Sequence, residues 1–180
     1  MDSQKSKYKL YLLFLPIVLV ALDQITKYMV RKDLSGGKVI TLIPKTLCFQ
    51  YVENRGAAWG LFQGKYDVLS AITVILLVGF IYLMIKMPTN KKNIPMYVIF
   101  LFIVSGAIGN LIDRLVFSYV TDFIYFELID FPVFNVADIY VTCSVILLVI
   151  LVLFYYSEDE LSYLPFFGSK KVEKKDESQN

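Results

Sequence analysis

Four aspartates are the side chains best suited to chemistry in this chain of 180 residues. The sequence contains no histidine and two cysteines, which excludes Ser-His-Asp triads, Cys-His pairs and zinc sites built on histidine. Two carboxyl groups held close together cannot both ionise easily, so one can take a proton from water while the other polarises a peptide carbonyl. The residue types therefore favour peptide hydrolysis without a metal or cofactor. The four candidates are Asp23, Asp113, Asp122 and Asp138.

Local surroundings favour Asp122 and Asp138 as the reacting pair, although the spacing of the four aspartates leaves the choice open. Asp138 is expected near the start of a helix, where the helix dipole stabilises an ionised carboxylate. Asp122 lies in the strand-like stretch 120–124, whose neighbouring residues are mostly apolar. The other two aspartates each have a basic residue close by in the sequence, which suits a structural ion pair.

The polar residues around these aspartates also have purely structural explanations. Asp23 and Lys27 lie four residues apart and could form an ion pair on the surface of one helix. Asp113 and Arg114 could simply end a helix. Asn135 could be the N-cap of the next helix, with an acidic residue three positions later as in a capping box.

Three other features, one short stretch and two single residues, have simpler explanations than chemistry. The stretch Gly56-Ala57-Ala58 could permit a tight turn of the backbone. Trp59 is typical of an anchor in the membrane interface, and Cys143 is typical of packing within a helix. None of them identifies a site alone.

Four segments of the chain contain no charged residue, and they predict the elements that must position the polar residues. Three of them have 18, 19 and 18 residues, within the range of roughly 17–25 that a membrane-spanning helix needs. The first has 13, but its helix can continue as far as Val30. The segments are Leu10–Leu22, Val68–Ile85, Ile94–Ile112 and Ile139–Tyr156. We therefore expect a membrane protein with an all-α core.

The composition supports membrane insertion. Hydrophobic residues make up 57% of the chain and the mean hydropathy is +0.58, whereas soluble domains are roughly 45–50% apolar. The net charge of +2 gives no sign of a nucleic-acid partner. The first segment could be a cleaved signal peptide, because three lysines precede it, but no small-x-small cleavage pattern follows at Val20-Ala21-Leu22. We expect one domain over residues 1–180, with helices at about 10–30, 68–85, 94–112 and 139–156.

Basic residues predict the orientation of the chain, because cytoplasmic connections carry an excess of Lys and Arg. With the N-terminus inside, the inner pieces hold 10 basic residues in 41 positions, and the outer pieces hold 8 in 71. Both termini are therefore expected in the cytoplasm, and the connections 23–67 and 113–138 outside. The polar tail 157–180 is expected to be cytoplasmic and disordered at its end.

The outer connections differ from ordinary loops. The stretch 39–52 is rich in β-branched and aromatic residues and predicts two short strands with a turn at Pro44-Lys45. The stretch 116–134 contains a similar strand-like run. We expect a small β-structure on the outer face of the membrane.

The unusual polar residues converge on that same face in this topology. Ionisable groups at such a depth are costly and are candidates for function. Those placed there are Asp23, Gln24, Lys27, Asn54, Asn110, Asp113, Arg114, Asp122, Asn135 and Asp138.

Five blocks of sequence, in this order, resemble the bacterial lipoprotein signal peptidases, known as signal peptidase II. The resemblance runs from Asp23 to about Thr142 and includes the expected four-helix topology. The blocks are Asp23-Gln24-Ile25-Thr26-Lys27, Asn54-Arg55-Gly56-Ala57-Ala58-Trp59-Gly60, Gly109-Asn110-Leu111-Ile112-Asp113-Arg114, Val120-Thr121-Asp122-Phe123-Ile124 and Phe134-Asn135-Val136-Ala137-Asp138.

The resemblance implies an aspartic endopeptidase, with Asp122 and Asp138 as its catalytic pair. The family's substrate is a prolipoprotein whose cysteine already carries diacylglycerol, and cleavage just before that cysteine frees the signal peptide. Residues implied to bind substrate or support the pair are Asp23, Lys27, Asn54, Gly56, Asn110, Asp113, Arg114, Asn135 and Ala137.

The resemblance also implies the partners and the location. The partners are lipidated prolipoproteins and membrane lipids, with inhibition by globomycin-type cyclic peptides, and no nucleic acid or cofactor. We expect a monomer in the bacterial cytoplasmic membrane with its active site at the outer face. The stretch between Asp122 and Asp138 is a couple of residues shorter than is usual in the family, which predicts a shortened outer loop.

Other classes of protein remain alternatives on the residues alone. A small transporter would need carboxylates along a path across the membrane, and the apolar helix interiors carry none. A membrane scaffold subunit would explain the helices but not five polar blocks on one face. A Ser-Lys signal peptidase would need a lysine near Ser70 or Ser105, and the sequence offers none.

Overall fold

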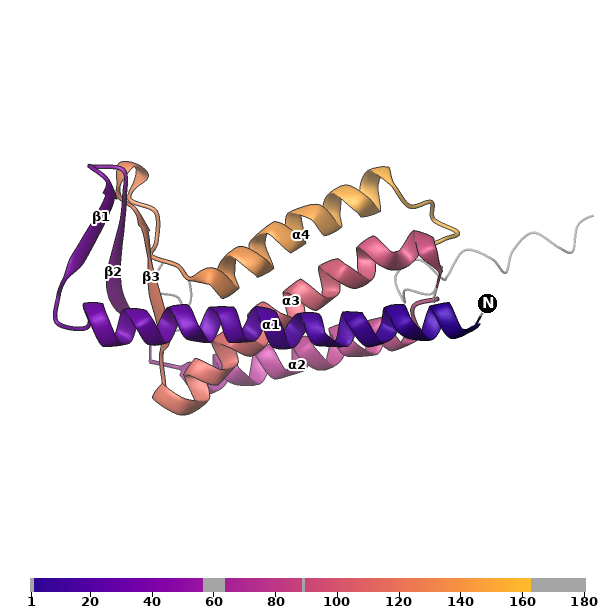
Figure 1. Ribbon diagram of the computed structural model, residues 1–180, viewed down its shortest axis with the longest axis horizontal. Coiled ribbons are helices and arrows are strands. Elements are labelled where there is room, and N and C mark those ends of the chain that lie inside the picture. Colours follow the sequence, from indigo (N-terminus) through magenta and orange to yellow (C-terminus); the bar gives the residue numbers. More distant parts are fainter. Residues whose placement is uncertain (1, 57–63, 89, 163–180) are drawn as a thin grey trace, which may run out of the picture.

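The computed structural model describes residues 2–56, 64–88 and 90–162, with side chains from residue 14 onward. Long helices lie side by side, and a small sheet stands at one end of them, opposite the N-terminus (Figure 1). The central helix α3 packs against each of the other three. The helices are α1 Asp2–Leu34, α2 Tyr66–Lys86, α3 Ile94–Phe117 and α4 Val136–Phe154; the strands are β1 Val39–Ile43, β2 Leu47–Asn54 and β3 Val120–Phe126; two short 3-10 helices are η2 Lys91–Asn93 and η3 Glu127–Ile129.

Three of the helices are long and apolar enough to cross a membrane. They are α2, α3 together with η2, and α4, with mean hydropathies of 2.7, 2.0 and 2.7. The side chains of α2 and α4 are mostly exposed, as expected of helices that face lipid, whereas about half of α3 is buried because it lies between the others. The apolar spans expected at 68–85, 94–112 and 139–156 are confirmed as helices. The helix expected at about 10–30 lies within the 33-residue α1.

Two predicted boundaries are wrong for the same physical reason. Helix α3 continues past Ile112 to Phe117 and ends where Ser118 adopts a left-handed conformation with φ 64°. Val116 and Phe117, expected in a strand, are therefore helical. Helix α4 begins at Val136, three residues before the charge-free segment, which agrees with the capping box offered for Asn135 and not with the bound taken from apolar length. A search for charge-free segments misses helix ends, since charged residues are common there.

The three strands form an antiparallel sheet in the order β1-β2-β3. The two strands predicted within 39–52 are confirmed, with the hairpin turn at Pro44-Lys45, where Lys45 has φ 55°. After β3 the chain turns through η3 and returns, so that Phe134 pairs with Ile124. This return brings the start of α4 back beside β3.

Apolar packing holds the sheet onto the helices. Phe123 of β3 packs against Val30 and Leu34 at the end of α1. A second cluster, which includes Met96 and Phe100, joins α2, α3 and the segment after α4 at the opposite end. Trp59 and residues 163–180 of the tail lie outside the described residues, so the expectations for them are not tested.

Candidate active site

A pocket of about 930 Å³ opens where the sheet meets the helices. Its walls come from β2, α3, β3, α4 and the turn before α4, so segments far apart in the sequence contribute to one cavity. Asp122 and Asp138 both line it, together with Asn54, Asn110 and Arg114. The pair of aspartates favoured by the sequence therefore faces a common space.

Asp122 reaches the pocket from strand β3, and 2% of its surface is exposed. Each carboxylate oxygen accepts one amide hydrogen bond: Oδ2 from Asn54 Nδ2 at 2.7 Å and Oδ1 from Asn135 Nδ2 at 2.6 Å. Burial, and next the negative charge of Asp138, raise the pKa of Asp122 to about 7, against the stabilising effect of the two amides. Near neutral pH this carboxyl group can therefore hold a proton.

Asp138 occupies the third position of α4, where the fold uses it for capping. Its Oδ2 accepts the backbone N–H of Asn135 at 3.1 Å, and Asn135 Oδ1 accepts the backbone N–H of Asp138 at 3.0 Å. Its other oxygen, Oδ1, accepts from Asn110 Nδ2 at 2.8 Å. The helix dipole at this end favours a negative charge. The structural explanation of Asn135 is thus confirmed, and the same residue also contacts Asp122.

Three asparagines hold the two carboxylates, and a second contact fixes the orientation of each amide. Asn54 Oδ1 accepts the backbone N–H of Gly56 at 3.0 Å, so its NH₂ group must point toward Asp122. Asn110 Oδ1 accepts from Lys27 Nζ at 2.9 Å, so its NH₂ group points toward Asp138. Asn135 Oδ1 is occupied by a backbone N–H of its own capping box. Three amides therefore present hydrogen-bond donors to the carboxylates.

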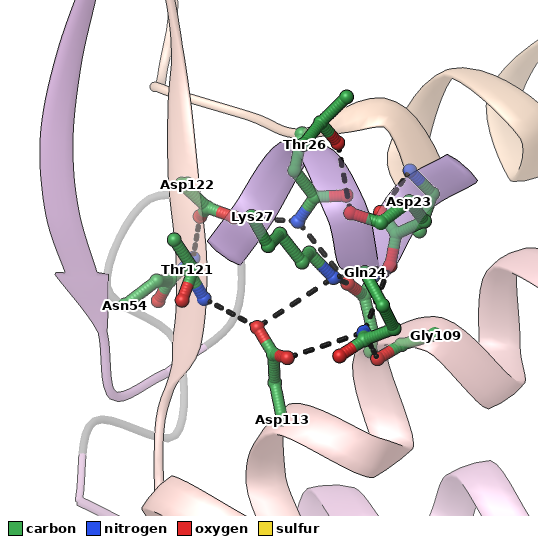
Figure 2. A network of polar contacts seen from close by, with 12 residues as sticks. Asp23, Gln24, Thr26, Lys27, Asn54, Gly109, Asp113, Thr121 and Asp122 are labelled. Atoms are coloured by element: carbon green, nitrogen blue, oxygen red, sulfur yellow. Dashed lines mark hydrogen bonds and ion pairs between the residues drawn. The ribbon is translucent and has the colours of Figure 1, made fainter. Parts of the chain in front are cut away.

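Behind the pocket lies a buried ionic cluster, drawn in Figure 2. Lys27 Nζ lies 2.9 Å from Asp23 Oδ2 and 3.6 Å from Asp113 Oδ2, and all three side chains are fully buried. Asp23 and Lys27 are therefore not an ion pair on a helix surface. Among the described residues, the cations paired with Asp113 are Lys27 and Arg31. The pairing of Asp113 with its neighbour Arg114 is wrong, because Arg114 faces the pocket instead.

The remaining predicted residues also belong to this group. Gly56 lines the pocket and fixes Asn54 through its backbone N–H. Ala137 is fully buried, and its backbone N–H donates to Asp23 Oδ1 at 3.0 Å. The structure thus brings the site residues that the family resemblance implied into the pocket or into the network directly behind it, whereas Ala57, Ala58 and Trp59 lie outside the described residues.

The sequence placed Gln24 on this face without giving it a role, and it did not predict Arg31 or Thr121 as part of the site. Gln24 Nε2 donates to Asp113 Oδ1 and to the carbonyl of Gly109. Arg31 lies 3.5 Å from Asp113 and donates to Thr121 Oγ1 at 2.8 Å. One signal was available, because Arg31 lies four residues after Lys27 on the same helix face. Thr121 also donates its backbone N–H to Asp113 Oδ2 at 2.9 Å, and a backbone contact of this kind leaves no mark on the sequence.

The arrangement is suited to acid–base chemistry on a peptide. In the described part of the chain, no three His, Cys, Asp or Glu side chains are grouped as they would be to hold a metal ion. Two carboxyl groups with different surroundings, one buried in a strand and one at a helix N-terminus, can take opposite protonation states. The pocket beside them has room for an extended peptide segment.

Comparison with known proteins gives a consistent result. Residues 15–154 match the family model described as signal peptidase (SPase) II. A lipoprotein signal peptidase of Clostridium novyi is 45% identical over 137 residues, which cover 74% of this chain and 91% of that protein. One from Streptococcus pyogenes serotype M6 is 42% identical, covering 80% and 93%. A solved bacterial membrane enzyme is 32% identical with a TM-score of 0.70, covering 92% of this chain and 94% of that one.

Proposed function

The chain belongs to the signal peptidase II family, and on this basis we propose that it removes the signal peptides of prolipoproteins by aspartic catalysis with Asp122 and Asp138. The lipoprotein signal peptidases it resembles support the reaction. The main observation in favour of aspartic catalysis is that the two carboxyl groups line one pocket. The amides of Asn54, Asn110 and Asn135 hold these carboxyl groups.

Asp138 acts as the general base in this proposal. It removes a proton from a water molecule, and the oxygen of that water forms a bond to the scissile carbonyl carbon. Support comes from its position in the first turn of α4 and from the two N–H groups donated to its oxygens by Asn110 and Asn135. Both features stabilise a carboxylate over a carboxylic acid.

Asp122 acts as the general acid. Its pKa, raised to about 7, allows the protonated form to donate a hydrogen bond to the scissile carbonyl oxygen near neutral pH. The tetrahedral intermediate then collapses, the carbon–nitrogen bond breaks, and the proton taken by Asp138 passes to the leaving nitrogen. The products are the carboxylate of the signal peptide and the free amine of the mature lipoprotein. A coupled pair titrates as a unit, so the two roles belong to the dyad.

Arg114 is proposed to bind the substrate backbone. It lines the pocket with both aspartates, and among the described residues no carboxylate is placed to form a salt bridge with it. A guanidinium group in that position can donate to the carbonyl groups of an extended peptide.

The substrate is proposed to be a prolipoprotein whose cysteine carries diacylglycerol, cleaved just before that cysteine. The acyl chains would hold the cysteine in the outer leaflet, at the depth of the pocket. The same pocket would accept globomycin-type cyclic peptides, and the enzyme would act as a monomer among membrane lipids.

The proposed topology places α1 as a fourth span beside the three apolar helices. The sheet, the C-terminal end of α1 and the N-terminal end of α4 all lie at one end of the molecule (Figure 1). The basic residues favour that end as the extracytoplasmic one, with both chain termini in the cytoplasm. The site would then face the leaflet in which a lipidated cysteine is anchored.

One experiment tests the proposal directly. The purified protein is incubated with a diacylglyceryl-modified precursor, and the shortened product is identified by mass spectrometry. Cleavage on the amino side of the modified cysteine, lost in Asp122→Asn and in Asp138→Asn, is the expected result. Cleavage at any other position, or unchanged cleavage by both folded variants, would overturn it.

A further inference from the structure

Three charged side chains near the pocket have no part in the mechanism above. Asp23, Lys27 and Asp113 are fully buried and do not line the cavity. Burying charges costs several kcal/mol per ion, and a buried ion pair is often no more stabilising than apolar side chains of the same volume. Two carboxylates around one lysine are therefore hard to explain by stability alone.

The geometry of the two carboxylates suggests what they do. Asp23 Oδ1 accepts the backbone N–H of Ala137 at 3.0 Å, and Asp113 Oδ2 accepts the backbone N–H of Thr121 at 2.9 Å. Ala137 directly precedes Asp138, and Thr121 directly precedes Asp122. Each buried carboxylate thus holds the backbone N–H of the residue that precedes one member of the proposed catalytic pair.

Lys27 connects the two halves of this arrangement. Its Nζ contacts both carboxylates and also donates to Asn110 Oδ1 at 2.9 Å. Since Asn110 donates its NH₂ group to Asp138 Oδ1, the lysine reaches the catalytic pair by a side-chain path as well.

The contact at Ala137 also explains how α4 is placed. Ala137 is the second residue of α4, and the first N–H groups of a helix have no partner within it. Here α1 supplies the partner, because Asp23 belongs to α1. An ionic acceptor on one helix therefore fixes the height and rotation of the helix that carries Asp138.

We propose that Asp23, Lys27 and Asp113 form a framework of positioning residues that sets the distance between Asp122 and Asp138 by holding the backbone N–H groups of Thr121 and Ala137. This inference rests on the proposed function, since it assigns the framework to that catalytic pair. The framework lies behind the pocket and does not line it. It acts by keeping the carboxyl group carried on the strand at a fixed distance and orientation from the one carried on the helix.

Paired substitutions test the framework. In Asp23→Leu and Asp113→Leu the branched shape of the side chain is kept but the acceptor is lost, whereas Asp23→Asn and Asp113→Asn keep an oxygen that can accept the same N–H. We expect each Leu variant to lower kcat about 10²-fold, the usual effect of a misplacement near 1 Å, with KM changed less than twofold. The Asn variants should retain at least tenfold more activity than the Leu variants.

Asn93→Ala provides the matched control. Asn93 is also a buried polar residue of the helix bundle, but it donates to Pro88 at the end of the molecule away from the sheet. This variant should lose thermal stability and keep the wild-type kcat. Equal activity of the Leu and Asn variants, or loss of kcat only in proportion to the unfolded fraction, would overturn the framework.

The two proposals fail in different ways. If Asp122→Asn and Asp138→Asn remain active, the catalytic assignment fails, whatever the framework variants do. If those two are inactive while Asp23→Leu and Asp113→Leu keep full kcat, the catalytic assignment stands and the framework alone is overturned.

Discussion

A methyl group on Gly109 would lie 2.5 Å from Oδ2 of Asp23, which is closer than real side-chain contacts allow. The absence of a side chain at this position lets α3 approach α1 closely enough for the ionic cluster to form. Gly106, three residues earlier, has the same relation to α4, where a methyl group would lie 2.5 Å from the carbonyl oxygen of Ala137.

Replacing Gly109 by alanine should therefore damage the site. Alanine in place of glycine within a helix ordinarily stabilises by about 0.5–1 kcal/mol. In Gly109→Ala, overpacking that costs about 1–3 kcal/mol should reverse this sign, and displacement of Asp23 should lower kcat. The control is Gly79→Ala in α2, where a methyl group meets nothing within 4 Å. A thermal unfolding series in detergent, with kcat measured on the same samples, checks both. Equal behaviour of the two variants would contradict the close approach.

The catalytic pair makes a second prediction. Asp122→Asn and Asp138→Asn keep the size of the side chain and remove the ionisable group. Each should lower turnover by a factor on the order of 10²–10⁴, the usual contribution of a positioned acid or base. The double variant should be little worse than either single one, because the two residues act as a unit. Asp33→Asn, on an exposed residue of α1, is the control. Multiplicative losses in the double variant would argue against a shared proton.

The pKa of Asp122 makes a third prediction. If the protonated form is the acid, kcat/KM should fall about tenfold per pH unit above about 7, the value to which burial raises this pKa. The raised pKa of Asp122 also affects the stability of the fold. Between about pH 4 and pH 7 the folded protein keeps a proton at Asp122, whereas the unfolded chain, with an ordinary pKa near 4, has lost it. The free energy of unfolding should therefore decrease as pH rises through this range. Asp122→Asn should remove that part of the slope. An activity profile that is flat between pH 6 and pH 9 would contradict the assignment.

A fourth prediction concerns the lipid on the substrate. In the membrane the acyl chains are already in an apolar phase, so their transfer contributes little binding energy, and their effect should be to place the cysteine at the height of the pocket. An unlipidated precursor of the same sequence should be cleaved far more slowly. Rates on both precursors, measured in one detergent with and without EDTA, check this. Equal rates would remove the lipid from the mechanism, and loss of activity in EDTA would contradict metal-free catalysis.

A fifth prediction concerns orientation. In a background in which Cys48 and Cys143 are replaced by serine, a cysteine at Lys38 should react with a membrane-impermeant maleimide applied to intact cells. Lys38 is exposed beside the sheet. A cysteine at Lys91, exposed in η2 between α2 and α3, should react only after the cells are opened. The reverse labelling pattern would place the pocket in the cytoplasm.

The sequence predicted the parts of this fold that depend on local patterns. Apolar length predicted α2, α3 and α4, and β-branched residues around Pro44-Lys45 predicted the β1–β2 hairpin. The ends of α3 and α4 were misplaced because charged residues belong to their terminal turns. Those turns are held by a capping box and by tertiary contacts, which apolar length does not detect.

The site likewise has a part that local sequence patterns predict and a part that depends on tertiary contacts. Its residues could be named from their types, because carboxylates and amides within a membrane protein are costly unless they are paired. Their pairing could not be predicted, since it depends on which helix faces cross. Asp113 lies next to Arg114 in the sequence, yet its cations are Lys27 and Arg31 of α1, more than 80 residues away, because side chains of adjacent residues on a helix point in different directions. The backbone contacts of Thr121 and Ala137 were not predictable at all, because an N–H group looks the same at every position.

The link between Asp23 and Ala137 joins residues 114 positions apart, and it has a consequence for how the enzyme is made. A chain that leaves the ribosome from its N-terminus has already delivered α1, the sheet and α3 before α4 is synthesised. A nascent chain that ends at Phe134 carries Asp122 but neither Asn135 nor Asp138. If Asp122 and Asp138 are the catalytic pair, as proposed, hydrolytic activity arises only when the final helix is inserted, and a newly synthesised molecule stays inert toward neighbouring precursors until its own translation is nearly complete.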